Sequence, residues 1–190
     1  MKEDLEKLKS PYDAKNTEDR IYKLWEKSGF FNPDNLPGKR PETFSIALPP
    51  PNATGVLHLG HTLEDSMQDT MVRYQRMRGK RTLWLPGTDH AAIATDSKVT
   101  KILEKEGIKK KDVGREKFLQ RVDAFVAESR KTIVSQLRKM GASLDWSREA
   151  FTYDEERNIA VRTAFKKMYD DGLIYRGHRI VNWDPKGQTV

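Results

Sequence analysis

The most regular hydrophobic pattern of the chain begins at Phe44. A strand is predicted over residues 44–48, and the three prolines that follow end it because proline cannot donate a hydrogen bond to a sheet. After a short polar turn, a helix is predicted from about His58 or Gly60 to Gly79. Its apolar stripe is expected to face the core and consists of Leu63, Met67, Thr70 or Met71, Tyr74 and Met77.

A second strand is predicted over residues 82–85, so that strand, helix and strand follow one another within about forty residues, as in a right-handed parallel crossover. Parallel strands place their carboxyl ends at the same edge of a sheet. We therefore expect residues 86–90, after the second strand, to lie beside residues 50–52, after the first. The pattern predicts an α/β fold built on a parallel sheet.

Residues 1–43 are predicted to be a helical N-terminal extension and connector, and residues 44–190 the main domain. Within the extension, Asn16 or Thr17 is expected to cap a short helix that Gly29 ends. The apolar face of that helix is predicted from Ile21, Leu24 and Trp25.

Beyond the second strand, helices are predicted over residues 93–106 and 115–140, separated by a solvated charged turn at 109–112. Thr152 to Glu155 fits a capping box for a further helix that Gly172 stops. A strand pair near the end of the chain is expected from Ile174, Tyr175, Ile180 and Val181.

Composition narrows the class of protein. The 190 residues contain no cysteine, which excludes disulfides and thiolate metal sites. No apolar run reaches membrane length and the first residues are charged, so a cytoplasmic protein without membrane contact is expected. The formal net charge of +7 is compatible with a polyanionic partner.

The segment after the first strand carries the chemistry. His58 and His61 lie three residues apart at a predicted helix N-terminus, where imidazole donors and the helix dipole favour phosphate. Gly60 leaves room for a flat group such as a purine to lie against the backbone. Asp89, on the neighbouring loop, offers a carboxylate to an ammonium group. These residues describe a pocket for a nucleoside phosphate and a small amine.

Other interpretations of the same residues remain open at this point. His58 and His61 also form a zinc half-site, although no cysteine and no convincing third ligand accompany them. Either histidine could be an ordinary surface or core residue, and Asp89 could be a turn residue after Gly87.

A family resemblance favours the first interpretation. Residues 49–61, Pro-Pro-Pro-Asn-Ala-Thr-Gly-Val-Leu-His-Leu-Gly-His, resemble the first ATP motif of class I aminoacyl-tRNA synthetases. Residues 85–95 resemble the valine-specific version of the next motif, and residues 141–148, 172–177 and 182–186 are similar to the same valine-specific enzymes. The resemblance covers nearly the whole chain and implies the first half of a Rossmann-like catalytic domain with helical insertions.

The resemblance implies that His58 and His61 hold the ATP phosphates while the carboxylate of valine attacks. It implies ATP contacts for Thr54 and Gly55 and places Gly60 against adenine. The products would be valyl-adenylate and pyrophosphate, followed by transfer of valine to tRNA. Mg²⁺ would accompany ATP, and the chain would hold no metal of its own.

On the amino-acid side, the resemblance assigns the α-ammonium to Asp89 and the pocket wall to Pro50, Pro51 and Asn52. Ala92 departs from the family, which usually has glycine there. The family's lysine-bearing mobile loop, anticodon-binding helices and editing domain are missing from the chain. We therefore expect an N-terminal part of a synthetase, weak or inactive alone.

Two rival functions remain. The first is a non-enzymatic nucleotide- or RNA-binding module, which predicts RNA retention with a steep salt dependence that is indifferent to valine. The second is a nucleotidylyltransferase with the same histidine motif, which does not explain the segment from Gly87 to Thr95. An unpaired sheet edge would favour self-association, although the sequence leaves the oligomeric state open.

Overall fold

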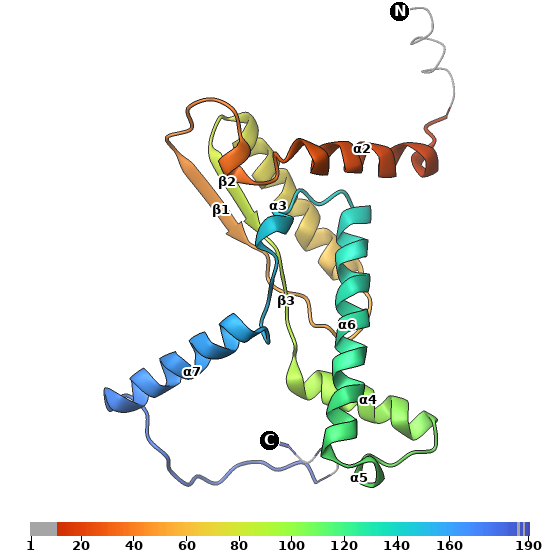
Figure 1. The fold of residues 1–190 in the computed structure, drawn as a ribbon, viewed down its shortest axis with the longest axis vertical. Coiled ribbons are helices and arrows are strands. Elements are labelled where there is room, and N and C mark those ends of the chain that lie inside the picture. The colour runs from red at the N-terminus through yellow and green to blue at the C-terminus, as the bar shows by residue number, and fades with distance from the viewer. Residues whose placement is uncertain (1–10, 186, 188) are drawn as a thin grey trace, which may run out of the picture. The chain divides into compact units, whose positions relative to one another are not determined.

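The computed structural model describes residues 11–185, 187 and 189–190 of the chain (Figure 1). The chain divides into two compact units. Among the described residues, unit 1 combines residues 11–49, 57–86 and 133–149, and unit 2 combines residues 50–56, 87–132 and those from 150 onward. In the described part of the chain, no helix is both long enough and apolar enough to cross a bilayer.

Unit 1 is built on the predicted strand, helix and strand. β1 (Thr43–Ala47) and β2 (Arg81–Leu85) pair in parallel, and α3 (Leu59–Met77) connects them (Figure 1). The register places Ala47 opposite Leu85 at the carboxyl ends of the two strands. The sequence prediction of a parallel crossover is therefore confirmed.

The core of unit 1 is centred on Trp84 of β2. Its side chain is fully buried, and its indole Nε1–H donates a hydrogen bond of 2.9 Å to Oε1 of Gln68 on α3. The last part of α6 (Arg115–Lys139) belongs to this unit and packs into the same core. The buried residues of the cluster are Leu48, Val72, Trp84, Ile133, Leu137, Ala142 and Leu144.

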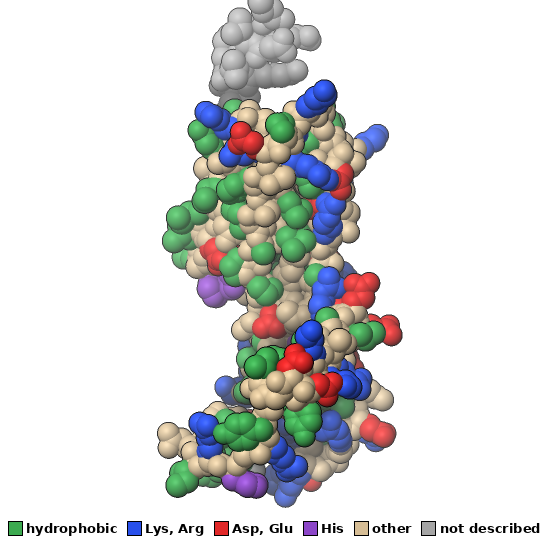
Figure 2. Space-filling view, turned by 90° about the vertical axis from the view of Figure 1, so that its left-hand side faces the viewer, with side chains coloured by type: hydrophobic (Ala, Val, Ile, Leu, Met, Phe, Trp, Pro, Cys, Tyr) green, Lys and Arg blue, Asp and Glu red, His purple; other side chains and the backbone are tan. Residues whose placement is uncertain are grey.

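The prediction for the apolar stripe of α3 was wrong in one respect, because the stripe is exposed. Leu63 is 65% exposed and Met67 61% exposed, and the whole exposed set is Leu59, Leu63, Met67, Met71, Tyr74 and Met77. Hydrophobic side chains are visible on the surface of unit 1 in Figure 2. Within unit 1, only Asp65 and Val72 of α3 are buried.

The inner side of α3 is held by charged contacts instead. Asp69 accepts a hydrogen bond from the hydroxyl of Ser143 and one of 2.8 Å from Nε of Arg73. Arg76 donates from Nη2 to the carbonyl oxygen of Ser143 at 2.8 Å, and Arg73 donates to that of Gly141 at 2.7 Å. Because these charged groups anchor the segment after α6, the apolar face of the helix points the other way.

We expect the exposed stripe to make the isolated chain self-associate through a second copy, because a contiguous apolar helix face is an association site in water. Leu63→Lys combined with Met67→Lys should weaken the association by about tenfold or more, since each change removes a large apolar side chain from the contact. Sedimentation velocity over a range of concentrations measures this. Thr62→Lys, at an exposed position of the same helix outside the stripe, is the matched control and should change little; a clean monomer for the unaltered chain at high concentration would contradict the expectation.

α2 (Ala14–Ser28) is the predicted N-terminal helix with a different cap. The cap is Asp13, whose carboxylate accepts a hydrogen bond of 3.2 Å from the backbone N–H of Asn16, so the prediction of Asn16 or Thr17 was wrong. Gly29 ends the helix in the left-handed conformation with φ of 73°, as predicted. A 3₁₀ turn, η1 (Pro33–Asn35), follows in the connector.

The residue of α2 that is buried is Tyr22, whereas Leu24, predicted for the apolar face, is 62% exposed. The Tyr22 hydroxyl donates to the carbonyl oxygen of Ala142 at 2.8 Å and accepts from Nε1–H of Trp146 at 2.8 Å. Burial raises the pKa of Tyr22 to about 12, which keeps the hydroxyl protonated and able to donate. Trp146 itself opens the 3₁₀ turn η2 (Trp146–Arg148).

In its described residues, unit 2 contains two short parallel strands and four helical segments, of which the last is α7 (Glu155–Asp170). β3 (Gly87–Thr88) pairs with β4 (Ala150–Phe151), and α4 (Ala92–Lys105), α5 (Lys110–Val113) and the first part of α6 surround a second core. The residues of that core are Ala53, Val99, Leu103, Phe118, Val122 and Val126. The charged segment predicted as a turn is thus one turn of helix, α5, whereas the long helices agree with prediction.

The remainder of unit 2 differs from the prediction in two places. α7 (Glu155–Asp170) is capped by Asp154, whose Oδ1 accepts from the backbone N–H of Arg157 at 2.9 Å, so Thr152 does not cap this helix. The predicted strand pair was also wrong, because the segment between α7 and Asp184 has no regular structure and Ile180 is fully exposed. Lys186, the last residue of one resembling segment, lies outside the described residues.

Candidate active site

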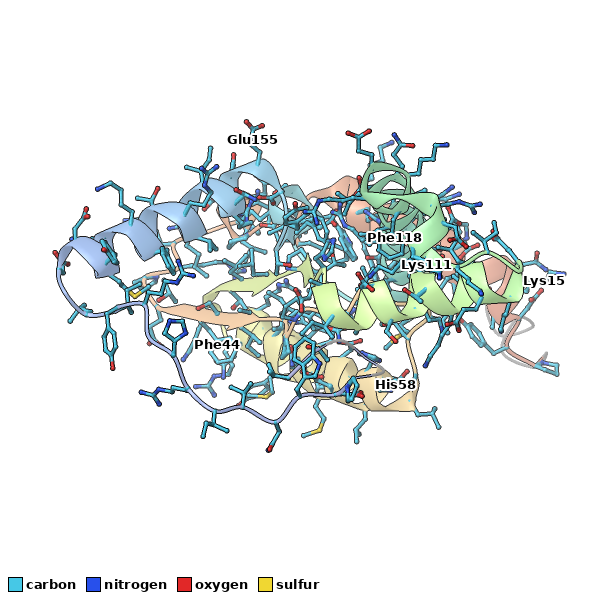
Figure 3. All side chains as sticks on the ribbon, turned by 90° about the horizontal axis from the view of Figure 1, so that it is seen from below. Lys15, Phe44, His58, Lys111, Phe118 and Glu155 are labelled. Carbon is cyan, nitrogen blue, oxygen red and sulfur yellow. The ribbon has the colours of Figure 1, made fainter. Side chains whose placement is uncertain are left out.

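The two histidines cap the beginning of α3 reciprocally. His58 is the N-cap, and its Nδ1 accepts a hydrogen bond of 3.1 Å from the backbone N–H of Gly60. Nδ1 of His61 accepts one of 3.2 Å from the backbone N–H of His58. Figure 3 shows His58 at the N-terminal end of α3. Two imidazoles therefore take the place of the hydroxyl and carboxylate of an ordinary capping box.

This arrangement fixes which ring nitrogen carries the proton. Because Nδ1 of each neutral imidazole accepts from the backbone, Nε2 must carry the hydrogen and act as donor. Burial, and then the neighbouring His58, lower the pKa of His61 below the ordinary 6.5, while Glu64 acts in the opposite direction. The neutral form of His61 is thus favoured at neutral pH. With ring centroids 3.9 Å apart, the pair presents two N–H donors close together at a helix N-terminus.

Gly60 is required by the cap itself. A Cβ atom at this position would lie 2.8 Å from Cε1 and 3.0 Å from Nδ1 of His58, closer than side chains approach one another. A larger residue would displace the imidazole from its hydrogen bond. The predicted contact of Gly60 with a purine is a separate matter and stays a prediction.

The two loops expected to meet do so within unit 2. The backbone N–H of Asp89 donates to the carbonyl oxygen of Pro51 at 2.9 Å, and that of Ala53 donates to the carbonyl oxygen of Asp89 at 2.7 Å. These bonds form a parallel bridge between Asn52 and Asp89. Gly87 belongs to the same arrangement, since a Cβ there would lie 3.7 Å from Cβ of Pro50. The predicted proximity of residues 50–52 and 86–90 is confirmed for the residues of unit 2.

The side chain of Asp89 is held by a residue that the sequence did not suggest. The hydroxyl of Thr152, directly after β4, donates to Oδ1 of Asp89 at 2.7 Å and accepts from the backbone N–H of His90 at 2.9 Å. The ring of His90 lies 4.8 Å from that of Tyr153 and 6.0 Å from that of Phe151, measured between centroids. The segment after β4 is therefore part of the site, and a two-residue strand is too short to be recognised from hydrophobic periodicity.

Thr88 and Ala91 complete this loop. Nε of Arg130 donates to the hydroxyl of buried Thr88 at 3.0 Å, and the Thr95 hydroxyl donates to the carbonyl oxygen of His90 at 2.6 Å. Ala91 adopts the left-handed conformation with φ of 48° at the start of α4. Ala92, the position where the sequence departs from the family, is the first helical residue and has no such strain.

A buried carboxylate lies one helical turn beyond His61. Asp65 is 4% exposed, and its Oδ2 has no hydrogen-bond partner among the described residues. Burial, followed by the nearby charges of Glu64 and Asp69, raises the pKa of Asp65 to about 6. Asp65 lines a cavity of about 200 Å³ in unit 1 together with Ser66, Asp69, Thr70, Arg73, Met140 and Ala142.

This carboxylate predicts a pH dependence of stability. Because the pKa of Asp65 is about 6 in the folded chain and 3.8 ordinarily, the folded state binds the proton more tightly, and stability falls as pH rises through this interval. Asp65→Asn should therefore raise the free energy of unfolding by up to about 3 kcal/mol at about pH 7 and give no gain near pH 4. Urea unfolding at both pH values measures this. Asp69→Asn, which disrupts the contacts with Ser143 and Arg73, is the matched control and should destabilise; a loss of stability in Asp65→Asn at neutral pH would contradict the expectation.

Among the residues that the structure describes, no three carboxylate, histidine or cysteine side chains gather in a metal-binding geometry. Both Nδ1 atoms of the histidine pair are occupied by backbone donors. The Nε2 atoms carry hydrogen in this arrangement, so the pair is suited to anionic oxygen rather than to a cation.

A parallel strand, helix and strand with a histidine pair at the helix start is typical of a nucleotide-binding α/β domain. Residues 20–190 match the family model described as tRNA synthetases class I (I, L, M and V), and the chain belongs to this family. A solved ternary complex from Agrobacterium radiobacter K84, titled LeuRS-tRNA-LeuAMS, has the same fold with a TM-score of 0.76 and 24% identity, over 94% of this chain and 21% of that one.

Two relatives share more of the sequence than this structural neighbour does. The chain is 54% identical over its whole length to a protein of Clostridium acetobutylicum named valine--tRNA ligase, of which it covers 21%. It is 52% identical over 96% of its length to the protein of the same name from Thermus thermophilus, again covering 21%. The chain therefore spans about a fifth of the length of these relatives.

Proposed function

We propose that the chain is the N-terminal part of the catalytic domain of a valine–tRNA ligase, which activates valine with ATP and transfers it to tRNA. The observation that carries the proposal is the reciprocal capping of α3, which leaves two imidazole N–H donors at a helix N-terminus. The names of the relatives at 54% and 52% identity support valine as the amino acid and tRNA as the acceptor.

The triphosphate is assigned to the beginning of α3. Nε2–H of His58 and of His61 would donate to phosphate oxygens, and Thr54, Gly55 and Gly60 would contact the rest of ATP. Mg²⁺ enters this scheme with the triphosphate, as part of the substrate, because the donor hydrogens of the imidazole pair would repel a cation held directly. In that role it neutralises phosphate charge.

Valine is assigned to the loops of unit 2. The carboxylate of Asp89 would pair with the α-ammonium group, and Pro50, Pro51 and Asn52 would line the wall around the side chain. The backbone hydrogen bonds from Asp89 to Pro51 and from Ala53 to Asp89 support this assignment, because they hold the carboxylate and the wall in one rigid piece.

The reaction needs no nucleophile from the protein. An oxygen of the valine carboxylate attacks the α-phosphorus of ATP, the bond to the β-phosphate oxygen breaks, and pyrophosphate leaves with the electron pair. Donors aimed at the phosphate oxygens stabilise the charge that accumulates in this step, and binding both substrates supplies the orientation. The adenylate then passes its valyl group to a hydroxyl of tRNA and releases AMP.

We also propose that residues 1–43 form an extension to the catalytic domain and that residues 44–190 form its first half, in a cytoplasmic protein, since the charging of tRNA belongs to that compartment. Because the chain spans about a fifth of its relatives, we expect its exchange rate to be far below that of a longer synthetase.

Valine-dependent exchange of labelled pyrophosphate into ATP tests the proposed function, together with direct binding of a non-hydrolysable valyl-adenylate analogue. We expect slow exchange that requires valine and saturable binding of the analogue in preference to its leucyl counterpart. Equal binding of the two analogues, or RNA binding that ignores valine and falls steeply with salt, would instead support the rival binding module.

A further inference from the structure

Besides the Asp89 carboxylate itself, the hydroxyl of Thr152 is a hydrogen-bonding group at the loop that carries Asp89 and His90. A hydroxyl has one hydrogen, and that of Thr152 is directed at Oδ1 of Asp89 over 2.7 Å. One of its lone pairs is fixed by the backbone N–H of His90 at 2.9 Å. The backbone N–H of Thr152 donates to the carbonyl oxygen of Thr88 at 3.1 Å, which continues the β3–β4 pairing. Both the position and the rotation of the hydroxyl are therefore determined.

The hydroxyl is not required for the start of α7, which is the ordinary structural use of a threonine at this position. Asp154 caps that helix with its own carboxylate, which accepts a hydrogen bond of 2.9 Å from the backbone N–H of Arg157. The same carboxylate accepts one of 3.2 Å from the backbone N–H of Phe151 in β4. The contacts of the Thr152 hydroxyl lie instead with Asp89 and His90, 63 and 62 residues away in the chain.

We propose that Thr152 is a positioning residue, which holds the carboxylate of Asp89 so that Oδ2 receives the α-ammonium group of the amino acid. The inference rests on the proposed function, because it assigns the ammonium group to Asp89. A carboxylate that is free to rotate loses rotational freedom when it binds an ammonium group, and this loss weakens binding. A carboxylate that is already held through Oδ1 has lost that freedom before the ligand binds. The ring of Tyr153, the residue after Thr152, also contacts the ring of His90, the residue after Asp89.

The expected effect is confined to the amino group of the ligand. Two non-hydrolysable adenylate analogues serve as probes, the valyl compound and its 3-methylbutanoyl counterpart, which differs only by lacking the amino group. The ratio of their dissociation constants for the intact chain, measured by isothermal titration calorimetry, reports the contribution of the ammonium contact alone. Thr152→Val keeps the shape of the side chain and removes the hydroxyl, and Thr152→Ser keeps the hydroxyl.

Thr152→Val should lower the preference for the amino compound by about tenfold, the value of an orienting hydrogen bond to a charged group, and leave the affinity for the other compound unchanged. Thr152→Ser should restore the preference. An equal weakening of both compounds in Thr152→Val would overturn the proposal, because it would show a merely structural role, and so would an unchanged preference.

Asp89→Asn separates this inference from the proposed function. Loss of the preference in Asp89→Asn with retention in Thr152→Val overturns the positioning role and leaves the function standing. Retention of the preference in Asp89→Asn would show that Asp89 does not bind the ammonium group. That result overturns both the positioning role of Thr152 and the proposed amino-acid site. Loss in both variants, with rescue by Thr152→Ser, supports the positioning role.

Discussion

Replacing both imidazoles by side chains that preserve the helix cap, His58→Ser together with His61→Glu, is expected to lower valine-dependent pyrophosphate exchange by at least about a hundredfold. Serine is a good N-cap, and glutamate three residues later returns a bond to the backbone N–H of the cap residue. Neither side chain carries an N–H group, so the variant removes the two N–H donors from the phosphate site and leaves the beginning of α3 satisfied. Its free energy of unfolding should stay within about 1 kcal/mol of the original.

The matched comparison is His58→Ala together with His61→Ala. This variant should lose the exchange activity to the same extent and, in addition, about 1–2 kcal/mol of stability, because the backbone N–H groups of Gly60 and His58 lose their acceptors. Exchange rates and urea unfolding of both variants distinguish the two roles of the pair. If the cap-preserving variant kept most of the exchange rate, the imidazoles would act only as caps, and the assignment of the phosphates to them would be wrong.

Trp84→Ala is expected to lower the free energy of unfolding by about 3–5 kcal/mol, a large part of the stability of a small domain. The fully buried indole fills the centre of the core of unit 1 and donates to Gln68 on α3. Its removal leaves a cavity and an amide of Gln68 without this partner. Urea unfolding followed by circular dichroism measures the change.

Trp84→Phe is the control for volume. It keeps an aromatic ring in the core and removes the N–H donor, so it should cost about 1–2 kcal/mol. A loss below about 1 kcal/mol in Trp84→Ala would show that β2 and α3 are not held together by this core.

The sequence was sufficient for the elements whose signals are local. The run of prolines ended β1, Gly29 ended α2, and His58 stands at the cap of α3 as the pattern indicated. The proximity of Asp89 to Pro51 followed from the rule that parallel strands end at one edge. In each case one residue type, or one topological rule, was enough.

Which face of α3 is covered by the rest of the chain could not be predicted in the same way. Helical spacing shows that one side of a helix is apolar, but not which neighbour covers that side. Here the charged residues Asp69, Arg73 and Arg76 contact the segment after α6, so the apolar side faces outward in this chain. A prediction from periodicity assumes that a neighbouring element covers the apolar side, and in the described residues Leu63 and Met67 are mostly exposed.

Thr152 was misassigned for a different reason. Thr152 and Asp154 both carry an oxygen that can cap a helix, and they are only two residues apart, so the sequence does not decide between them. In the structure Asp154 takes the cap and Thr152 bonds to Asp89, a contact between segments 63 residues apart. Contacts of this kind depend on tertiary structure, which is why the positioning role was invisible in the sequence.

The most direct measurement of the central claim is a crystal structure of the chain with a non-hydrolysable valyl-adenylate analogue. The account predicts one bound molecule whose ammonium group lies within hydrogen-bond distance of the Asp89 carboxylate, and whose phosphate-mimicking group is reached by Nε2 of His58 or His61. An analogue bound with its ammonium group away from Asp89, or with neither imidazole near the phosphate mimic, would contradict it.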